Sequence, residues 1–152
     1  MATITNQAAL SYNGVTTLSN IAVGELVEVL TATKTAADTT YTAGGIKTFV
    51  ISLVNSSAAA LTGLTVTDTL GSYTFSGNTL YPLTYVTGSL LYYVNGALQA
   101  TPTVTATAPL TVTGVTVPAG GSAMLIYTAR VNEYAPLGVE DSITNTATIT
   151  GG

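Results

Sequence analysis

The stretch "AGGIKTFVISLVN" (residues 43–55) has a near copy later in the chain, "AGGSAMLIYTARVN" (residues 119–132). In each copy a Gly-Gly turn precedes a long apolar run that ends in Asn. Near-continuous apolar runs of this length are typical of strands in the middle of a sheet. We therefore predict that these two segments are central strands of one β-sandwich.

The remaining sequence also favours an all-β fold. Of the 152 residues 31 are Thr, and Thr, Val, Ile and Tyr suit the pleated, half-buried surface of a sheet. Strand-like runs bounded by Gly, Pro and Asn are expected at residues 26–35, 64–70, 110–118, 122–132 and 143–150. "SLLYYVNGALQ" (residues 89–99) adds a hairpin signal at Asn95–Gly96. The prediction is an immunoglobulin-like antiparallel β-sandwich of about seven to nine strands, plus an N-terminal extension strand.

The charge content argues against several classes of partner. The chain has three cations and seven acids, and its net charge is −4. Binding to nucleic acid or to an anionic membrane surface needs clusters of Lys and Arg, and no apolar run of about 18 residues is present. We expect no nucleic-acid partner and no membrane span, whereas the low charge favours association between copies.

The residues available for catalysis are few. His and Cys are absent, so the commonest general base, the thiol nucleophile and the soft metal ligands are missing. A glycosidase needs two facing carboxylates, but Glu140 and Asp141 are adjacent and point apart in an extended chain, as do Glu25 and Glu28. With Glu133, the first pair has oxygen ligands suited to calcium, but no spaced Asp/Asn loop accompanies them. We predict no enzyme activity, no cofactor and no metal site.

The two ends of the chain carry similar strands, "ITNQAALSYNG" (residues 4–14) and "ITNTATITGG" (residues 143–152). Strand geometry places alternate residues on one face. In the first copy this face holds Ile4, Asn6, Ala8, Leu10 and Tyr12. In the second copy it holds Ile143, Asn145, Ala147 and Ile149. Two strands with the same face can fill the same kind of position in a sheet.

Several motifs together resemble a known family. They are "LTVTDTL" (64–70), "VPAGGSAMLIYTARV" (117–131), "ITNTATIT" (143–150) and Lys34 within "TATKTA". In this order they resemble the conserved repeat domain found in tandem in bacterial surface proteins, over residues 25–152. Relatives of this family occur among spore-surface and appendage proteins. The resemblance implies an immunoglobulin-like structural module located outside the cell, on a cell or spore surface.

In a tandem array the motif "ITNTATIT" closes each repeat, so the N-terminal copy suggests a strand that completes a neighbour. We predict an assembly strand at residues 1–14, a linker at 15–24 and a sandwich domain at 25–152. Strand addition to the next subunit would then build a head-to-tail homopolymer. Ordering a free arm costs about as much as its burial and hydrogen bonds return. A stable filament therefore needs a second contact or an arm that is already partly ordered.

Two alternatives explain the N-terminal strand without assembly. Residues 4–12 would form the first strand of their own sandwich, or the chain would be a trimmed piece of a longer surface protein.

A covalent cross-link is a further hypothesis that follows from the resemblance. Some bacterial surface sandwiches join a strand Lys to an Asn of the last strand through an isopeptide bond, with a buried acid as catalyst. Lys34, Asp68 and Asn145 have the residue types for this reaction. The alternatives are that Asn145 hydrogen-bonds the backbone, that Lys34 extends its ammonium to solvent and that Asp68 caps a turn.

Two other function classes remain open. An adhesive module would bind carbohydrate or a host protein, and its best candidate surface is the aromatic stretch of Tyr73, Phe75, Tyr81 and Tyr85. These aromatics equally suit a core or a subunit interface. A spacer module of a cell-surface stalk is the third class.

Overall fold

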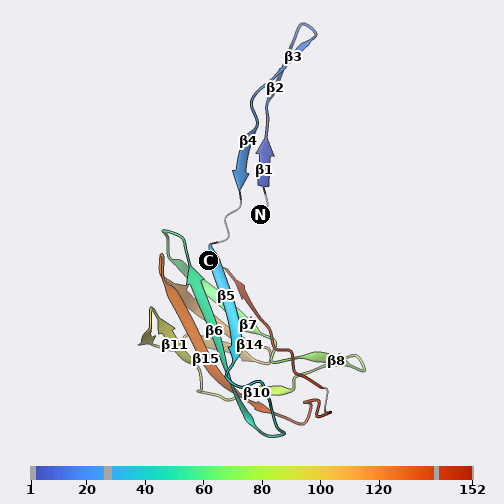
Figure 1. Cartoon of the computed structure of the whole chain (residues 1–152), viewed down its shortest axis with the longest axis vertical. Coiled ribbons are helices and arrows are strands. Elements are labelled where there is room, and N and C mark those ends of the chain that lie inside the picture. The colour runs from blue at the N-terminus through green and yellow to red at the C-terminus, as the bar shows by residue number, and fades with distance from the viewer. Residues whose placement is uncertain (1–2, 26–28, 139–140, 152) are drawn as a thin grey trace.

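The computed structural model describes residues 3–25, 29–138 and 141–151. They form a two-layer β-sandwich and a separate N-terminal ribbon that points away from it (Figure 1). Every strand pair among these residues is antiparallel. The predicted all-β sandwich is confirmed.

The larger sheet is built on the two copies of the repeated motif. β6 (Ile46–Asn55) pairs with β15 (Ser122–Val131) from the Ile46–Arg130 pair to the Val54–Ser122 pair. The other strands of this sheet are β5 (Leu30–Ala36) outside β6, and β11 (Leu91–Val94), β12 (Ala97–Gln99) and β10 (Leu83–Tyr85) beyond β15. The prediction that the two motifs form central strands is confirmed.

The second sheet has four strands. Their order is β13 (Thr103–Thr107), β14 (Leu110–Val117), β7 (Leu61–Asp68) and β16 (Ala147–Thr150). The described residues thus place ten strands in the two sheets, more than expected, because β10 and β13, of three and five residues, have no counterpart among the predicted strands. The last strand also begins later than predicted, although residues 143–146 continue its alternation of half-buried and exposed side chains.

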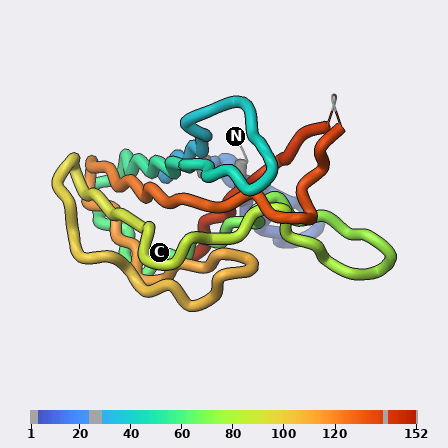
Figure 2. Tube along the Cα trace, turned by 90° about the horizontal axis from the view of Figure 1, so that it is seen from below, coloured from blue at the N-terminus to red at the C-terminus, as the bar shows by residue number. Residues whose placement is uncertain are grey.

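The core lies between the sheets and is filled by alternate residues of the long strands. Its most buried members include Ile51, Leu53, Leu125 and Tyr127 from the larger sheet and Leu64, Val66, Val112 and Val117 from the smaller. Removing these side chains from water is the main stabilising contribution to the fold. A hairpin of β8 (Tyr73–Phe75) and β9 (Asn78–Leu80) projects sideways from the sandwich (Figure 2).

The N-terminal ribbon is a long hairpin rather than a single strand. β1 (Thr3–Asn6) pairs with β4 (Ala22–Glu25), and β2 (Ala9–Tyr12) pairs with β3 (Val15–Leu18). The chain reverses at Asn13 and Gly14, whose φ angles of 51° and 80° are those of a type I′ turn.

The ribbon differs from the expected arrangement in two ways. Residues 15–24, expected as a linker, form most of its returning half, because the Asn-Gly pair turns the chain back on itself. Residues 4–12 pair within the ribbon and not with the sandwich, so they are not the first strand of their own domain.

Candidate functional site

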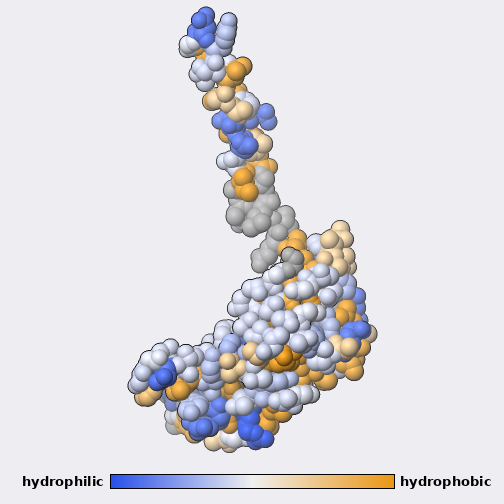
Figure 3. All heavy atoms as spheres, turned by 180° about the vertical axis from the view of Figure 1, so that it is seen from behind, coloured by the Kyte–Doolittle hydropathy of each residue, from blue (hydrophilic) through white to orange (hydrophobic). Residues whose placement is uncertain are grey.

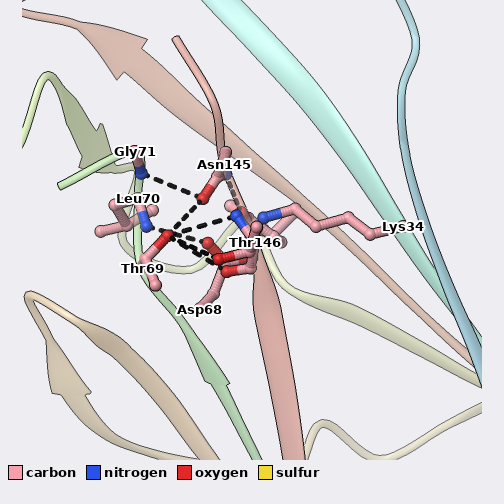
Figure 4. A network of polar contacts seen from close by, with 8 residues as sticks. Lys34, Asp68, Thr69, Leu70, Gly71, Asn145 and Thr146 are labelled. Atoms are coloured by element: carbon pink, nitrogen blue, oxygen red, sulfur yellow. Dashed lines mark hydrogen bonds and ion pairs between the residues drawn. The ribbon is translucent and has the colours of Figure 1, made fainter.

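Three side chains predicted from the sequence meet at one side of the core. Lys34 comes from β5, at the edge of the larger sheet, and Asp68 ends β7 in the smaller sheet. The Lys34 side chain is 12% exposed and that of Asp68 is 1% exposed. Lys34 Nζ donates a hydrogen bond to Asp68 Oδ2 (Figure 4). A lysine of an edge strand thus reaches across the core to the opposite sheet.

A tyrosine of the central strand links this ion pair to Asn145. The Tyr127 hydroxyl donates to Asp68 Oδ2 at 2.6 Å, and Asn145 Nδ2 donates to the Tyr127 oxygen at 3.2 Å. Two hydrogen bonds therefore connect the Asp68 carboxylate with the Asn145 carboxamide. Lys34 Nζ also lies 5.0 Å from the ring centroid of Phe49 and 5.9 Å from that of Tyr127, within cation–π range.

The Asn145 oxygen is held by the turn that follows β7. Gly71 N donates to Asn145 Oδ1 at 3.0 Å, and Thr69 Oγ1 lies 3.3 Å from the same oxygen. A backbone N–H can only donate, so the Gly71 contact assigns the carboxamide oxygen and leaves Nδ2 facing Tyr127. The Thr69 hydroxyl is also 3.2 Å from the Thr146 carbonyl, so its single proton is shared between the two acceptors.

The same turn requires an unusual backbone. Leu70 and Gly71 have φ angles of 52° and 71°, and the left-handed region is costly for a residue with a Cβ. Leu70 is fully buried and its N–H donates to Asp68 Oδ1 at 3.0 Å, which holds it in this conformation. A Cβ at Gly71 would clash with Ile143 Cγ2 and lie 3.1 Å from Pro82 Cγ. Glycine therefore lets the segment before β16 approach closely enough for Asn145 to bind the turn.

Burial sets the protonation behaviour of the cluster. Desolvation lowers the pKa of the Lys34 ammonium below its ordinary value, and the Asp68 charge and hydrogen bond only partly oppose this. Desolvation and the Asp68 charge raise the pKa of the Tyr127 hydroxyl, which stays protonated. A buried ion pair gains little from its charges in a dry site. Transfer of one proton from Lys34 to Asp68 would leave both groups neutral.

The structure also decides between the simpler roles suggested for these residues. Asn145 does bind the backbone, through Gly71, and Asp68 does cap the turn, through Leu70. Lys34 does not extend to solvent, because its ammonium turns inward to Asp68. Tyr127 and Gly71 are members of the cluster that the sequence pattern does not single out. Tyr127 occupies an inward position of a strand predicted to be central, and this is the one available signal for a buried hydroxyl.

The residues of the predicted assembly strand lie elsewhere, on the ribbon. Ile4 is 75% exposed, Leu10 71% and Tyr12 80%, and Asn6 and Ala8 are also exposed. The returning strands and their connection add the exposed apolar residues Val15, Leu18, Ile21 and Val23. Apolar and polar side chains alternate along the ribbon surface (Figure 3). The hydrogen bonds of the described ribbon side chains all end within the ribbon.

The aromatic stretch does not form one surface. Tyr85 is buried and its ring lies 6.2 Å from that of Tyr127, and Tyr81 is half-buried against the core. Tyr73 and Phe75 are exposed on the β8–β9 hairpin, and the Tyr73 hydroxyl donates to the Tyr134 carbonyl at 2.8 Å. The structure thus leaves two of the four aromatics for an external partner.

Glu140 lies outside the described residues, and within them no three His, Cys, Asp or Glu side chains gather as metal ligands would. An open cavity of about 670 Å³ is lined by residues of the loops that contain Tyr41 and Leu137. In the described part of the chain no helix has the length and apolarity to cross a membrane.

Solved structures with a similar fold come from a bacterial pilus. The pilus backbone protein RrgB from Streptococcus pneumoniae matches in one structure with a TM-score of 0.62 and 15% identity, over 81% of this chain. Its full-length structure matches with a TM-score of 0.62 and 13% identity, over 96% of this chain. This chain covers 31% and 28% of those two chains, so it spans about a third of their length. No family model and no curated protein matches the sequence. At these identities the likeness shows the fold, a β-sandwich of the kind found in a pilus backbone.

Proposed function

We propose that the protein is a structural module of a pilus-like filament outside the cell, and that an amide bond between Lys34 and Asn145 closes its sandwich. The observation that carries this proposal is the meeting of Lys34, Asp68 and Asn145 in one largely buried cluster. Support for a structural role comes from the fold, which is similar to that of a pilus backbone protein.

The cluster contains each group that the reaction needs. Asp68 accepts a proton from the Lys34 ammonium, which the low polarity of the site favours. The neutral Nζ attacks Cγ of Asn145, the Nζ–Cγ bond forms and the Cγ–Nδ2 bond breaks. The departing nitrogen takes up a proton and leaves as ammonia, and Asp68 carries one proton at the end of the reaction. No oxidant or cofactor takes part.

The amide would connect the N-terminal part of the sandwich to its C-terminal part. Lys34 lies on the first strand of the larger sheet, and Asn145 precedes the last strand of the smaller sheet. A pulling force applied to the ribbon and to the C-terminal strand would pass through the amide rather than through the hydrogen bonds between the strands. This is the property that a subunit of a long fibre under tension requires.

Trypsin provides a direct test because the chain has only three cleavage sites, after Lys34, Lys47 and Arg130. An amide blocks cleavage at Lys34 and joins residues 1–47 to residues 131–152. We expect mass spectrometry to find this branched species, one ammonia lighter than the sum of its parts. Free peptides 1–34 and 131–152 would show that Lys34 and Asn145 form only a hydrogen-bonded cluster.

The ribbon is the proposed joint between subunits. Its strands expose an apolar surface and carry unpaired backbone groups along both outer edges, which suits pairing with the edge of a neighbour's sheet. Because the ribbon is already paired with itself, it loses less conformational entropy on binding than a free strand would. Electron microscopy of the pure protein should show filaments. Monomers at high concentration would contradict self-assembly and leave the amide untouched.

A further inference from the structure

We propose that Tyr127 is a catalytic residue of amide formation, where it relays a proton from Asp68 to the departing nitrogen of Asn145, and that the Gly71 N–H polarises the carbonyl under attack. This inference rests on the proposed amide and assigns roles to two groups beyond the Lys, acid and Asn. Both groups touch the reacting carboxamide directly.

The directions of the hydrogen bonds define the relay. An ionised carboxylate can only accept, so the single hydroxyl proton of Tyr127 points to Asp68 Oδ2, 2.6 Å away. The lone pairs of the same oxygen accept from Asn145 Nδ2 at 3.2 Å. The Tyr127 oxygen therefore lies between the acid and the atom that must be protonated. Asp68 makes no hydrogen bond to Asn145 in the structure, and Tyr127 supplies the connection between them.

The carbonyl of Asn145 is held on its other side. Gly71 N lies 3.0 Å from Oδ1 and donates its hydrogen bond to this oxygen. A donor fixed in this position stabilises the negative charge that develops on oxygen as Nζ attacks. The Thr69 hydroxyl, shared with the Thr146 carbonyl, is a weaker second donor.

The proton movements then balance. After the attack, an electron pair on Oδ1 re-forms the carbonyl double bond and the Cγ–Nδ2 bond breaks. Nδ2 takes the hydroxyl proton of Tyr127, Tyr127 takes the proton of Asp68, and Asp68 takes the remaining extra proton from the Lys34 nitrogen. The products are the amide, ammonia, protonated Asp68 and an unchanged tyrosine. The raised pKa of the Tyr127 hydroxyl suits this role, because the group begins and ends protonated.

The test removes the hydroxyl group from each of two buried tyrosines by substitution with phenylalanine. The full-length chain is first recovered unfolded in denaturant, and its complete sequence mass shows that no amide has formed. During refolding, circular dichroism then follows the folding and mass spectrometry follows the loss of ammonia. In Tyr127→Phe we expect normal folding and amide formation slower by about 100-fold, as for loss of a general acid. Tyr92→Phe is the matched control. Tyr92 is 6% exposed and its hydroxyl bonds Thr116 O at 2.6 Å, away from the cluster. This control should form the amide at the wild-type rate.

The outcomes separate this inference from the proposed function. If the wild-type chain folds and keeps its full mass, the amide itself is wrong. If the wild type loses ammonia and Tyr127→Phe does so equally fast, the amide stands and the relay is wrong. If Tyr127→Phe fails to fold, 3-fluorotyrosine at position 127 keeps the shape and gives a more acidic hydroxyl. A several-fold faster reaction then supports the relay, and an unchanged rate overturns it.

Discussion

Asn145 Nδ2 donates a hydrogen bond to the Tyr127 hydroxyl at 3.2 Å, which joins the segment before the last strand of one sheet to the central strand of the other. The contact depends on the register of β16 against β7, where Ala147 lies opposite Asp68. This register places Asn145 beside the turn after Asp68 and directs its carboxamide into the core. The same arrangement therefore closes the sandwich and assembles the candidate site.

Substitution at Gly71 should destabilise the turn that follows β7. Gly71→Ala should cost about 3 kcal/mol of unfolding free energy, from the left-handed backbone and the clash with Ile143. Gly77→Ala is the control, since Gly77 has a φ of 80° but no atom within 4 Å of the place its Cβ would take, and should cost about 1 kcal/mol. Urea denaturation measures both values. Equal losses would show that Ile143 does not press on the turn.

The rate of amide formation should depend on pH in a defined direction. Only the neutral Lys34 amine can attack, and burial lowers its pKa below the ordinary value of 10.5. The rate during refolding should therefore rise with pH, as Lys34 loses its proton to solvent as well as to Asp68, and level off at a pH below 10.5. Asp68 and Tyr127 are the other titratable groups facing Lys34, and the raised pKa of Tyr127 keeps that hydroxyl protonated over this range. A rate that still climbs at pH 10.5 would mean that Lys34 behaves as an exposed lysine.

Pulling on the two ends of the chain should not extend the sandwich. With the amide in place, residues 35–144 are bypassed and bear no load. In Lys34→Met the same residues should unfold and release about 370 Å of extended chain. Lys47→Met is the control, because Lys47 is a second buried lysine whose ammonium binds the Asp38 and Thr40 carbonyls instead. Force spectroscopy that extends the wild type as far as Lys34→Met would argue against a covalent tie.

Charge on the ribbon face that holds Leu10, Tyr12 and Val15 should block assembly without unfolding the protein. Leu10→Asp places a carboxylate at a side chain that is 71% exposed, so the sandwich should keep its stability while filaments disappear. Ser11→Asp adds the same charge to the next residue, on the opposite face of β2, and should assemble normally. Electron microscopy and thermal unfolding measure the two properties. Filaments of Leu10→Asp would show that this face is not the joint.

The long strands are the most predictable part of the fold. β6 begins and ends where its apolar run does, and the likeness of its sequence to that of β15 reflects their shared position in the middle of one sheet. The short strands β10 and β13 are not predictable as separate strands, because three and five residues give too short a pattern to stand out, whereas β12 follows the Asn95–Gly96 turn that predicts it.

The sequence of the ribbon contains a turn signal, Asn13–Gly14, in addition to its likeness to the last strand. Asn13–Gly14 forms the same kind of turn as Asn95–Gly96, so the same rule that predicts the second hairpin also applies to the first. The prediction of a single extended strand followed by a linker is wrong because it gives the strand likeness more weight than this turn.

The candidate site is predictable by residue type and not by geometry. Lys34, Asp68 and Asn145 stand out in the sequence because a lysine, an acid and a last-strand asparagine are what the reaction needs. Their meeting depends on strand order, which places β7 beside β16 and points Lys34 of the opposite sheet toward Asp68. Tyr127 can be assigned only once the sheets are packed, since its hydroxyl gains its role from partners distant in sequence.

The intact mass of the folded full-length protein tests the amide between Lys34 and Asn145 most directly. We expect a mass lower than that of the sequence by one ammonia, and the full sequence mass in Lys34→Met and in Asn145→Ala. A wild-type protein that is fully folded and has its complete sequence mass would contradict the amide.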